Sequence, residues 1–131
     1  METERLKSIK LFEPIPDDEL AAIAPFAEER VVEAGTPLVK EGQFSYEFMA
    51  IEDGTAEVTR GGEHVADLGP GDFFGEIGLL ERALRTATVT ATSDMRLITL
   101  TGWDMKRMET AIPEAVEEIR RVLEERRPAT N

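Results

Sequence analysis

The stretch from Gly69 to Thr92 constrains the fold and the chemistry of this chain more than any other segment. It opens with a Gly-Pro turn and continues through two phenylalanines into Gly75 and Glu76. A short apolar segment, residues 77–80, has the length of one or two helical turns. The stretch closes in a run rich in Thr, Ala and Val, which is typical of a β-strand. A turn, a short helix and a strand are therefore predicted in close succession.

The closing strand carries a charged residue at an unexpected position. Because side chains alternate between the two faces of a strand, Arg85 shares a face with Ala87, Val89 and Ala91, and the threonines occupy the other face. The Ala/Val face is the expected core face, so Arg85 is predicted at the edge of a small apolar surface. A guanidinium there keeps its proton and needs an anion. A protein carboxylate or a ligand phosphate would each meet that need.

The start of the predicted helix offers groups that suit a sugar phosphate. Gly75 allows another group to approach the backbone closely. Free N–H groups at a helix start favour anions, and an acidic residue is tolerated there. The carboxylate of Glu76 can accept hydrogen bonds from sugar hydroxyls. One segment thus combines a hydroxyl acceptor, exposed amides and an arginine.

The two blocks F-G-E-I-G-L-L and R-T-A-T-V resemble the phosphate-binding cassette of cyclic-nucleotide-binding domains. That family includes the bacterial catabolite activator protein, regulatory subunits of the cyclic-AMP-dependent kinase and cyclic-nucleotide-gated channels. The resemblance implies a mainly β fold with flanking helices, a double-stranded β-helix or jelly-roll-like β-roll. It implies a single domain over residues 1–131, with N-terminal helices over 1–28, the β-roll over 30–100, the cassette at 71–89 and C-terminal helices over 102–127.

The same resemblance implies the site residues. Glu76 would accept the ribose 2′-hydroxyl, and Arg85 would pair with the exocyclic phosphate oxygens. Thr86 would lie beside the phosphate and the base. The backbone amides that line the phosphate and sugar would be those of Gly75, Ile77, Gly78 and Ala87. Apolar walls around the base, which are equally compatible with ordinary core, would come from Val65, Leu68 and Phe73.

A structural interpretation of the charged residues stays open. Arg85 and Glu76 could pair with each other, or Arg85 with Glu57, which aligns with the acidic residue that orients this arginine in kinase subunits. Strand parity places Glu57 on the face opposite Ala56 and Val58, however, so its contact with Arg85 does not follow from the pattern.

Composition removes several function classes. A net charge of −12 argues against a nucleic-acid partner, because such binding depends on neutralising phosphates. The chain has no cysteine, and its one histidine, His64, falls in a predicted solvated hairpin. A histidine-rich metal centre of the cupin type is therefore excluded, although an all-carboxylate site is not. No membrane span or signal-peptide core is evident, so a cytoplasmic protein is expected.

The remaining elements follow from turns and periodicity. Helices are expected before residue 28, broken by Pro14 and Pro16, and short strands between residues 30 and 68, with a hairpin turn at Gly61-Gly62. Further expected elements are a strand over 95–100, a helix near Trp103 or Asp104, and a final helix that begins at Pro113 and ends by Pro128.

The C-terminal helices could pack on the β-roll or cover a bound ligand. Trp103 is interpreted as a core anchor and not as a platform that stacks on a base. The final helix is too short for a coiled coil of its own, so it is expected to pack on the roll. Alternatively it covers the base as a lid, with Leu123, Arg126 or Arg127 in contact with the ligand.

The predicted function is cyclic-nucleotide sensing without catalysis, with no cofactor and no metal. Thr86 permits cyclic GMP and does not exclude cyclic AMP. Cyclic AMP is favoured because a compact chain of this kind resembles bacterial ones, in which that signal is commoner. The C-terminal helices would serve a protein effector, and a homodimer is compatible with the sequence. The alternatives are a non-binding β-roll that works as a protein-interaction module, and a jelly-roll metalloenzyme.

Overall fold

The computed structural model describes residues 1–45, 47–75 and 83–125. The helices in these residues are α1 (Thr3–Lys7), α2 (Asp17–Ile23), the short 3₁₀-helix η1 (Ala24–Phe26), α4 (Gly102–Ala111) and α5 (Pro113–Glu125). The strands are β1 (Glu28–Val32), β2 (Pro37–Val39), β3 (Phe44–Ser45), β4 (Glu47–Asp53), β5 (Ala56–Arg60), β6 (Glu63–Leu68), β7 (Phe73–Phe74), β8 (Ala83–Leu84), β9 (Thr88–Ala91) and β10 (Met95–Thr101).

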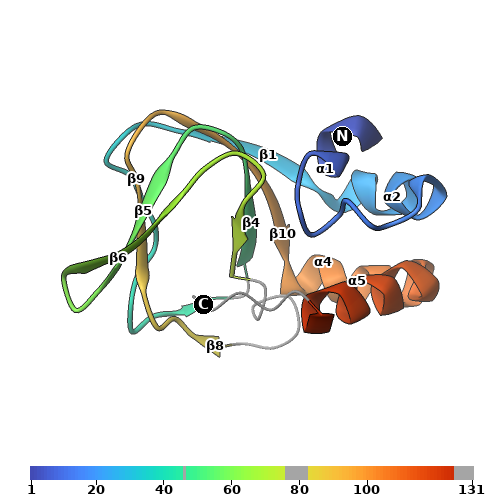
Figure 1. Ribbon diagram of the computed structural model, residues 1–131. Helices are drawn as coiled ribbons and strands as arrows, with labels where there is room; N and C mark the ends of the chain where they lie inside the picture. The colour runs from blue at the N-terminus through green and yellow to red at the C-terminus, as the bar shows by residue number, and fades with distance from the viewer. Residues whose placement is uncertain (46, 76–82, 126–131) are drawn as a thin grey trace.

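The strands form two four-stranded antiparallel sheets and a small ribbon. One sheet has the order β1-β10-β4-β7, the other β2-β9-β5-β6, and β3 pairs with β8. Figure 1 shows the two sheets wrapped into a roll, with all the labelled helices gathered beside β10 and away from β5 and β6. This is the mainly β, jelly-roll-like architecture with flanking helices that the sequence predicts.

Strand β4 is buried on both faces because it separates two hydrophobic cores. Phe48 and Ala50 belong to the core shared with the helices, whereas Met49 and Ile51 belong to the core inside the roll. In β10 the even-numbered apolar residues face the core shared with the helices, and the odd-numbered apolar residues face the core inside the roll. Such strands lack polar alternation, since neither face meets water.

The outer core joins the N-terminal and C-terminal helices to the roll. It combines apolar residues of α1, α2, α4 and α5 with the outer faces of β4 and β10. Phe48 lies at its centre, with the ring of Phe12 edge-on at a centroid distance of 5.9 Å and the ring of Phe73 at 5.7 Å. The final helix therefore packs beside the roll, as expected, through Ala115, Val116 and Ile119.

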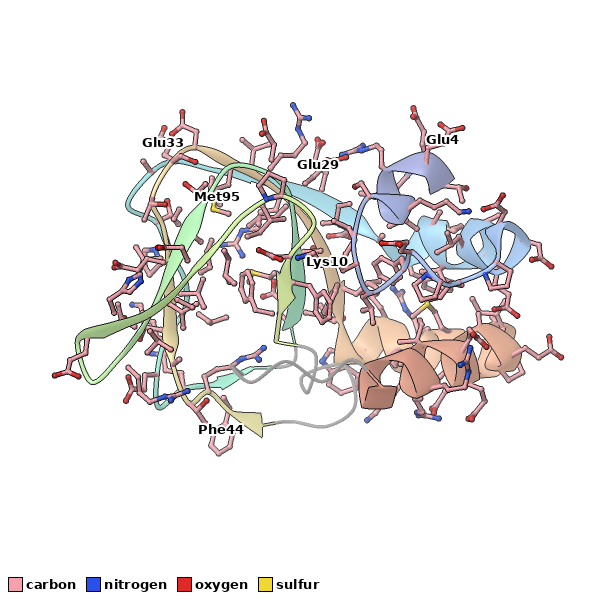
Figure 2. All side chains as sticks on the ribbon, viewed as in Figure 1. Glu4, Lys10, Glu29, Glu33, Phe44 and Met95 are labelled. Carbon is pink, nitrogen blue, oxygen red and sulfur yellow. The ribbon has the colours of Figure 1, made fainter. Side chains whose placement is uncertain are left out.

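Ion pairs hold the N-terminal segment against the roll. The guanidinium of Arg5 donates to both carboxylate oxygens of Glu52 at 2.7 Å and to Glu29 at 2.6 Å. Lys10 Nζ donates to Asp72 at 2.5 Å, and Figure 2 shows Lys10 between the helices and the strands.

Most predicted boundaries agree with the structure to within a few residues. The strand predicted at 95–100 is β10, α5 begins at Pro113, and the two-residue turn Gly61-Gly62 connects β5 to β6. The region predicted as helical to residue 28 ends earlier, because β1 begins at Glu28. The end of the last helix at Pro128 lies outside the described residues.

The interpretation of Trp103 as a core anchor is wrong. Its side chain is 63% exposed, with Lys106 Nζ 4.9 Å from the ring centroid. Helix α4 buries Gly102, Met105 and Met108, which recur every three residues and leave Trp103 on another side of the helix.

Candidate functional site

The guanidinium of Arg85 is buried, as the alternation of the segment predicts. Arg85 is 5% exposed, and Ala87, Val89 and Ala91 are equally buried, whereas Thr86 is exposed. The regular strand β9 begins only at Thr88, so Arg85 lies in the link between β8 and β9. Its N–H donates to the carbonyl of Gln43 at 2.9 Å, and its own carbonyl accepts from Gly42 at 2.9 Å.

Gly75 packs directly against the guanidinium of Arg85. A Cβ placed on Gly75 would lie 2.7 and 2.8 Å from the two terminal nitrogens of Arg85, and 2.6 Å from the carbonyl oxygen of Glu47. Gly75 also has a φ of +77°, a conformation that side chains disfavour. A hydrogen bond from Arg85 Nη2 to the carbonyl of Glu47 completes the contact. Three separate segments thus meet around one fixed positive charge.

Sequence reasoning did not identify Glu47 as part of this arrangement. The residue contributes its backbone carbonyl, and every residue type has one, so the sequence does not indicate which carbonyl accepts the bond. Only the pairing of β4 with its neighbours brings that carbonyl to Arg85.

Two of the predicted site residues, Thr86 and Ala87, directly follow Arg85 in the chain. Ala87 is buried and packs in the inner core. Thr86 is exposed, and its carbonyl accepts a hydrogen bond from Arg60 Nε at 3.2 Å. Glu76, Ile77 and Gly78 lie outside the described residues, and so do Arg126 and Arg127.

The three residues predicted to surround the base occupy different environments. Leu68 packs against the inner core. Val65 is 41% exposed and has no partner in the register between β5 and β6, which passes from Ala66 to His64. Phe73 packs against the outer core with Phe48, and it is Phe74 that lies in the inner core. Of the three, the structure brings only Leu68 to the inner core.

Glu57 does not pair with Arg85, contrary to one structural alternative. Its Oε2 lies 2.9 Å from Nδ1 of His64 on the outer surface of the β5–β6 hairpin. Parity explains this, because Ala56 and Val58 on either side of Glu57 point into the inner core.

The arrangement suits recognition of an anion. A guanidinium stays charged at any physiological pH and presents a planar set of donors that matches phosphate oxygens. Here that group is buried and lies against the backbone of Gly75. Burial in such surroundings strengthens its interaction with an anion relative to water.

Comparison with known proteins identifies the family. The profile of the cyclic nucleotide-binding domain family matches residues 29–109, and the chain belongs to this family. Members of the family serve as regulatory binding domains.

Among curated proteins, a cAMP-dependent protein kinase regulatory subunit of Yarrowia lipolytica is 39% identical over 97 residues, which cover 72% of this chain and 26% of that protein. A cyclic nucleotide-gated potassium channel of Rhizobium etli is 31% identical over 120 residues, which cover 92% of this chain and 34% of the channel. The chain therefore spans about a quarter to a third of these relatives.

Among solved structures, the N-terminal domain of a transcriptional regulator from Streptomyces coelicolor has a TM-score of 0.81 at 23% identity, with 95% of this chain and 91% of that one covered. This likeness supports the fold. Within the described residues, every helix is too short or too polar to cross a membrane.

Proposed function

We propose that this domain binds a cyclic nucleoside monophosphate, with cyclic AMP favoured over cyclic GMP, and acts as a non-catalytic sensor. The observation that carries the proposal is the buried guanidinium of Arg85 packed against the backbone of Gly75. A cyclic phosphodiester carries one negative charge and two exocyclic oxygens, which match the planar fork of an arginine.

The roles of the other residues follow the family resemblance. Glu76 accepts the ribose 2′-hydroxyl, and the amides of Gly75, Ile77, Gly78 and Ala87 line the phosphate and sugar. Thr86 lies beside the base, and Leu68 contributes an apolar wall. Phe73 has no part in the proposal, since it packs with the helices.

The names of several relatives support cyclic AMP. The regulatory subunit from Yarrowia lipolytica belongs to a cAMP-dependent kinase. Thr86 is compatible with either nucleotide, so the identity of the base rests on this relationship and not on a contact.

Signalling requires that the ligand bind two arrangements of the helices with different affinity. The helices share one core with β4, whose Glu47 carbonyl receives the hydrogen bond from Arg85. A ligand that repositions Arg85 therefore changes a strand on which the helices rest. An effector protein would recognise the resulting position of α4 and α5.

The direct test is thermal unfolding with cyclic AMP and cyclic GMP in a buffer that contains EDTA. A ligand present at one hundred times its Kd adds about 2.7 kcal/mol to the free energy of unfolding. We expect a saturable rise with cyclic AMP and a smaller one with cyclic GMP at equal concentration. No rise with millimolar nucleotide would instead favour a non-binding interaction module.

Substitutions at the site give the second prediction. Arg85→Ala should weaken nucleotide binding by about 2–5 kcal/mol, because the phosphate would lose a buried charged partner. Glu76→Ala should cost about 1–3 kcal/mol through lost hydrogen bonds. Arg96→Ala removes an equal charge from an exposed strand position and should bind as the parent does. Isothermal titration calorimetry measures all three, and parental affinity in both site variants would contradict the assigned roles.

A further inference from the structure

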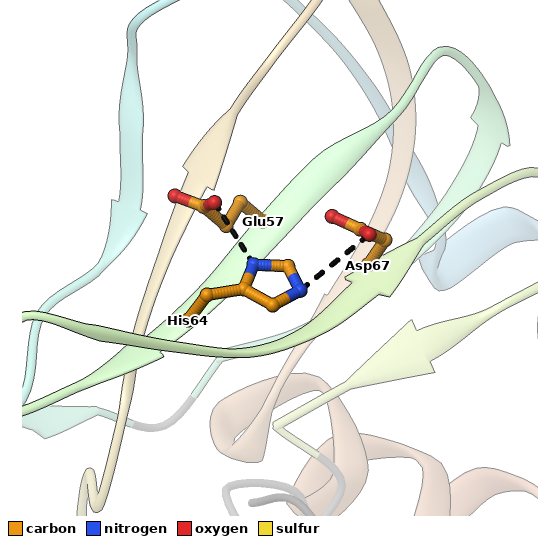
Figure 3. A group of neighbouring side chains, drawn as sticks. All are labelled: Glu57, His64 and Asp67. Carbon is orange, nitrogen blue, oxygen red and sulfur yellow. Dashed lines mark hydrogen bonds and ion pairs between the residues drawn. The ribbon is translucent and has the colours of Figure 1, made fainter.

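The β5–β6 hairpin gathers three potential metal ligands on its outer face. His64 Nδ1 lies 2.9 Å from Glu57 Oε2, and His64 Nε2 lies 3.5 Å from Asp67 Oδ2. Figure 3 shows the imidazole between the two carboxylates. Each residue offers a ligand atom within 4.8 Å of the other two. Tetrahedral Zn²⁺ with bonds near 2.1 Å holds its ligand atoms about 3.4 Å apart, so the present spacing is close to that of a site.

A β-bulge creates this grouping. His64 and Asp67 are three residues apart, and strict alternation would place them on opposite faces of β6. The register pairs Val58 with Ala66 but Thr59 with His64, so Val65 is passed over. The extra residue returns His64 to the face of Asp67, and such bulges commonly redirect a side chain.

The register also places two like charges directly opposite each other. Glu57 and Asp67 are partners across β5 and β6. Carboxylates in that position repel one another and destabilise a sheet. The imidazole of His64 lies between these two carboxylates. A cation between the two strands is therefore favoured.

We propose that Glu57, His64 and Asp67 form a surface site for a divalent transition metal of the Zn²⁺ class. The imidazole would contribute one nitrogen and each carboxylate one oxygen, with water at the remaining positions. An imidazole ligand favours zinc, nickel or copper over magnesium and calcium. The net charge of −12 attracts a cation to this surface.

Binding requires one rearrangement, because the two carboxylates lie beside different nitrogens of the ring. The side chain of Asp67 is 77% exposed and that of Glu57 is 40% exposed, so either can turn toward one shared nitrogen without disturbing packing. The metal would take the place of the proton that the imidazole shares with the carboxylates.

This site is independent of nucleotide binding. Ala56, Val58, Ala66 and Leu68 on the other face of the same two strands pack in the inner core. The proposed metal site and the proposed nucleotide site thus lie on opposite faces of one hairpin. A negative result for one proposal therefore does not contradict the other.

The test uses untagged protein at pH 8, where neutral imidazole is available for coordination. His64 is the only histidine, so its ring gives a single pair of imidazole signals in a proton–carbon NMR spectrum. We expect Zn²⁺ to shift these signals with saturation at one equivalent, and Mg²⁺ at the same concentration to leave them in place.

Matched variants separate a site from a generally acidic surface. Glu57→Gln and Asp67→Asn should each weaken Zn²⁺ binding by about tenfold or more. Glu63→Gln, which removes an exposed carboxylate from the same strand, should leave the affinity unchanged. Circular dichroism checks that the variants are folded. No saturable shift with Zn²⁺, or equal weakening by all three substitutions, would overturn the proposal.

Discussion

Arg85 and Gly75 depend on each other at the scale of single residues. The guanidinium fills the space in which any Cβ on Gly75 would lie. Burial of a charge is costly unless hydrogen bonds compensate it, and the carbonyl of Glu47 accepts one such bond from the guanidinium. Gly75 makes this packing possible, because its missing side chain lets the backbone lie against the charged group.

Gly75→Ala tests this dependence. A left-handed conformation costs a non-glycine residue about 1–2 kcal/mol by itself. Gly35→Ala carries the same cost, since Gly35 has a φ of +90° but nothing within 4 Å of its added Cβ. We expect Gly75→Ala to lose more stability in chemical denaturation than Gly35→Ala, and it alone should weaken nucleotide binding. Equal stability losses with equal affinity would show that the contact is unimportant.

Local parity predicted the burial of Arg85, because alternation needs only neighbouring residues. The same reasoning could not predict which of Phe73 and Phe74 faces the inner core and which faces the helices. β7 contains only these two residues, and a strand so short shows no alternation. The exposure of Val65 follows from alternation, because Ala66 and Leu68 face the inner core and Val65 therefore faces outward. The place of His64 beside Asp67 depends instead on a bulge, which is defined by the partner strand and not by the local sequence.

At the scale of elements, β10 connects the roll to the helices through a defined helix start. Thr101 Oγ1 accepts from the N–H of Asp104 at 3.1 Å, and the Asp104 carboxylate accepts from the N–H of Thr101 at 2.9 Å. This reciprocal capping box satisfies backbone donors that the first turn of α4 leaves without helical partners.

Removal of this cap should loosen α4. Thr101→Ala should lower the free energy of unfolding by about 1 kcal/mol. Thr110→Ala, at an exposed position of the same helix, should be neutral or slightly stabilising because alanine has the higher helix propensity. Urea denaturation followed by circular dichroism measures both. If Thr110→Ala costs as much as Thr101→Ala, the cap is not the source of the effect.

The sequence predicted β10 and the start of α5 well, since a mainly apolar segment with Ile and Thr and a proline at the first helical position are strong local signals. It did not predict that β4 and β10 each serve two cores. A continuous apolar strand indicates burial on both faces without revealing what covers them. The orientation of α4 was missed for a similar reason, because a tryptophan is a usual core residue, whereas the buried side of this helix carries Met105 and Met108.

At the scale of the whole molecule, the N-terminal segment is held by charge as well as by apolar contacts. The hydrogen bonds from Arg5 lower the pKa of the Glu52 carboxyl below its ordinary value, although partial burial acts in the opposite direction. A carboxyl with a lowered folded-state pKa stabilises the fold above its unfolded pKa, and that contribution is lost as the pH falls through the folded-state value.

The pH dependence of Arg5→Ala follows from this linkage. At pH 7 the variant should unfold at a lower temperature than the parent. The difference should shrink as the pH is lowered from 5 toward 3, because Glu52 becomes protonated in both proteins. Thermal unfolding at a series of pH values provides the measurement, and Lys40→Ala serves as a control for the loss of an exposed positive charge. A difference that stays constant over this range would contradict the assignment to Glu52.

Which charged residues meet across the molecule could not be read from the sequence. Arg5 and Glu52 are separated by 47 positions, and an acidic chain of this composition offers many equivalent partners. The overall fold was predictable because the cassette is a local pattern with a known family. The ion pairs, the bulge and the trio at His64 depend on tertiary register, which no short window contains.

The double burial of β4 has a mechanical consequence. The carbonyl that receives the hydrogen bond from Arg85 belongs to Glu47, and the next residue, Phe48, touches the rings of Phe12 and Phe73. One peptide unit therefore separates the charged centre of the roll from the aromatic cluster under the helices. A small movement of Arg85 would therefore move the backbone of Glu47, and with it the Phe48 ring that packs against Phe12 of the N-terminal segment. No loop would have to rearrange for this movement to be transmitted.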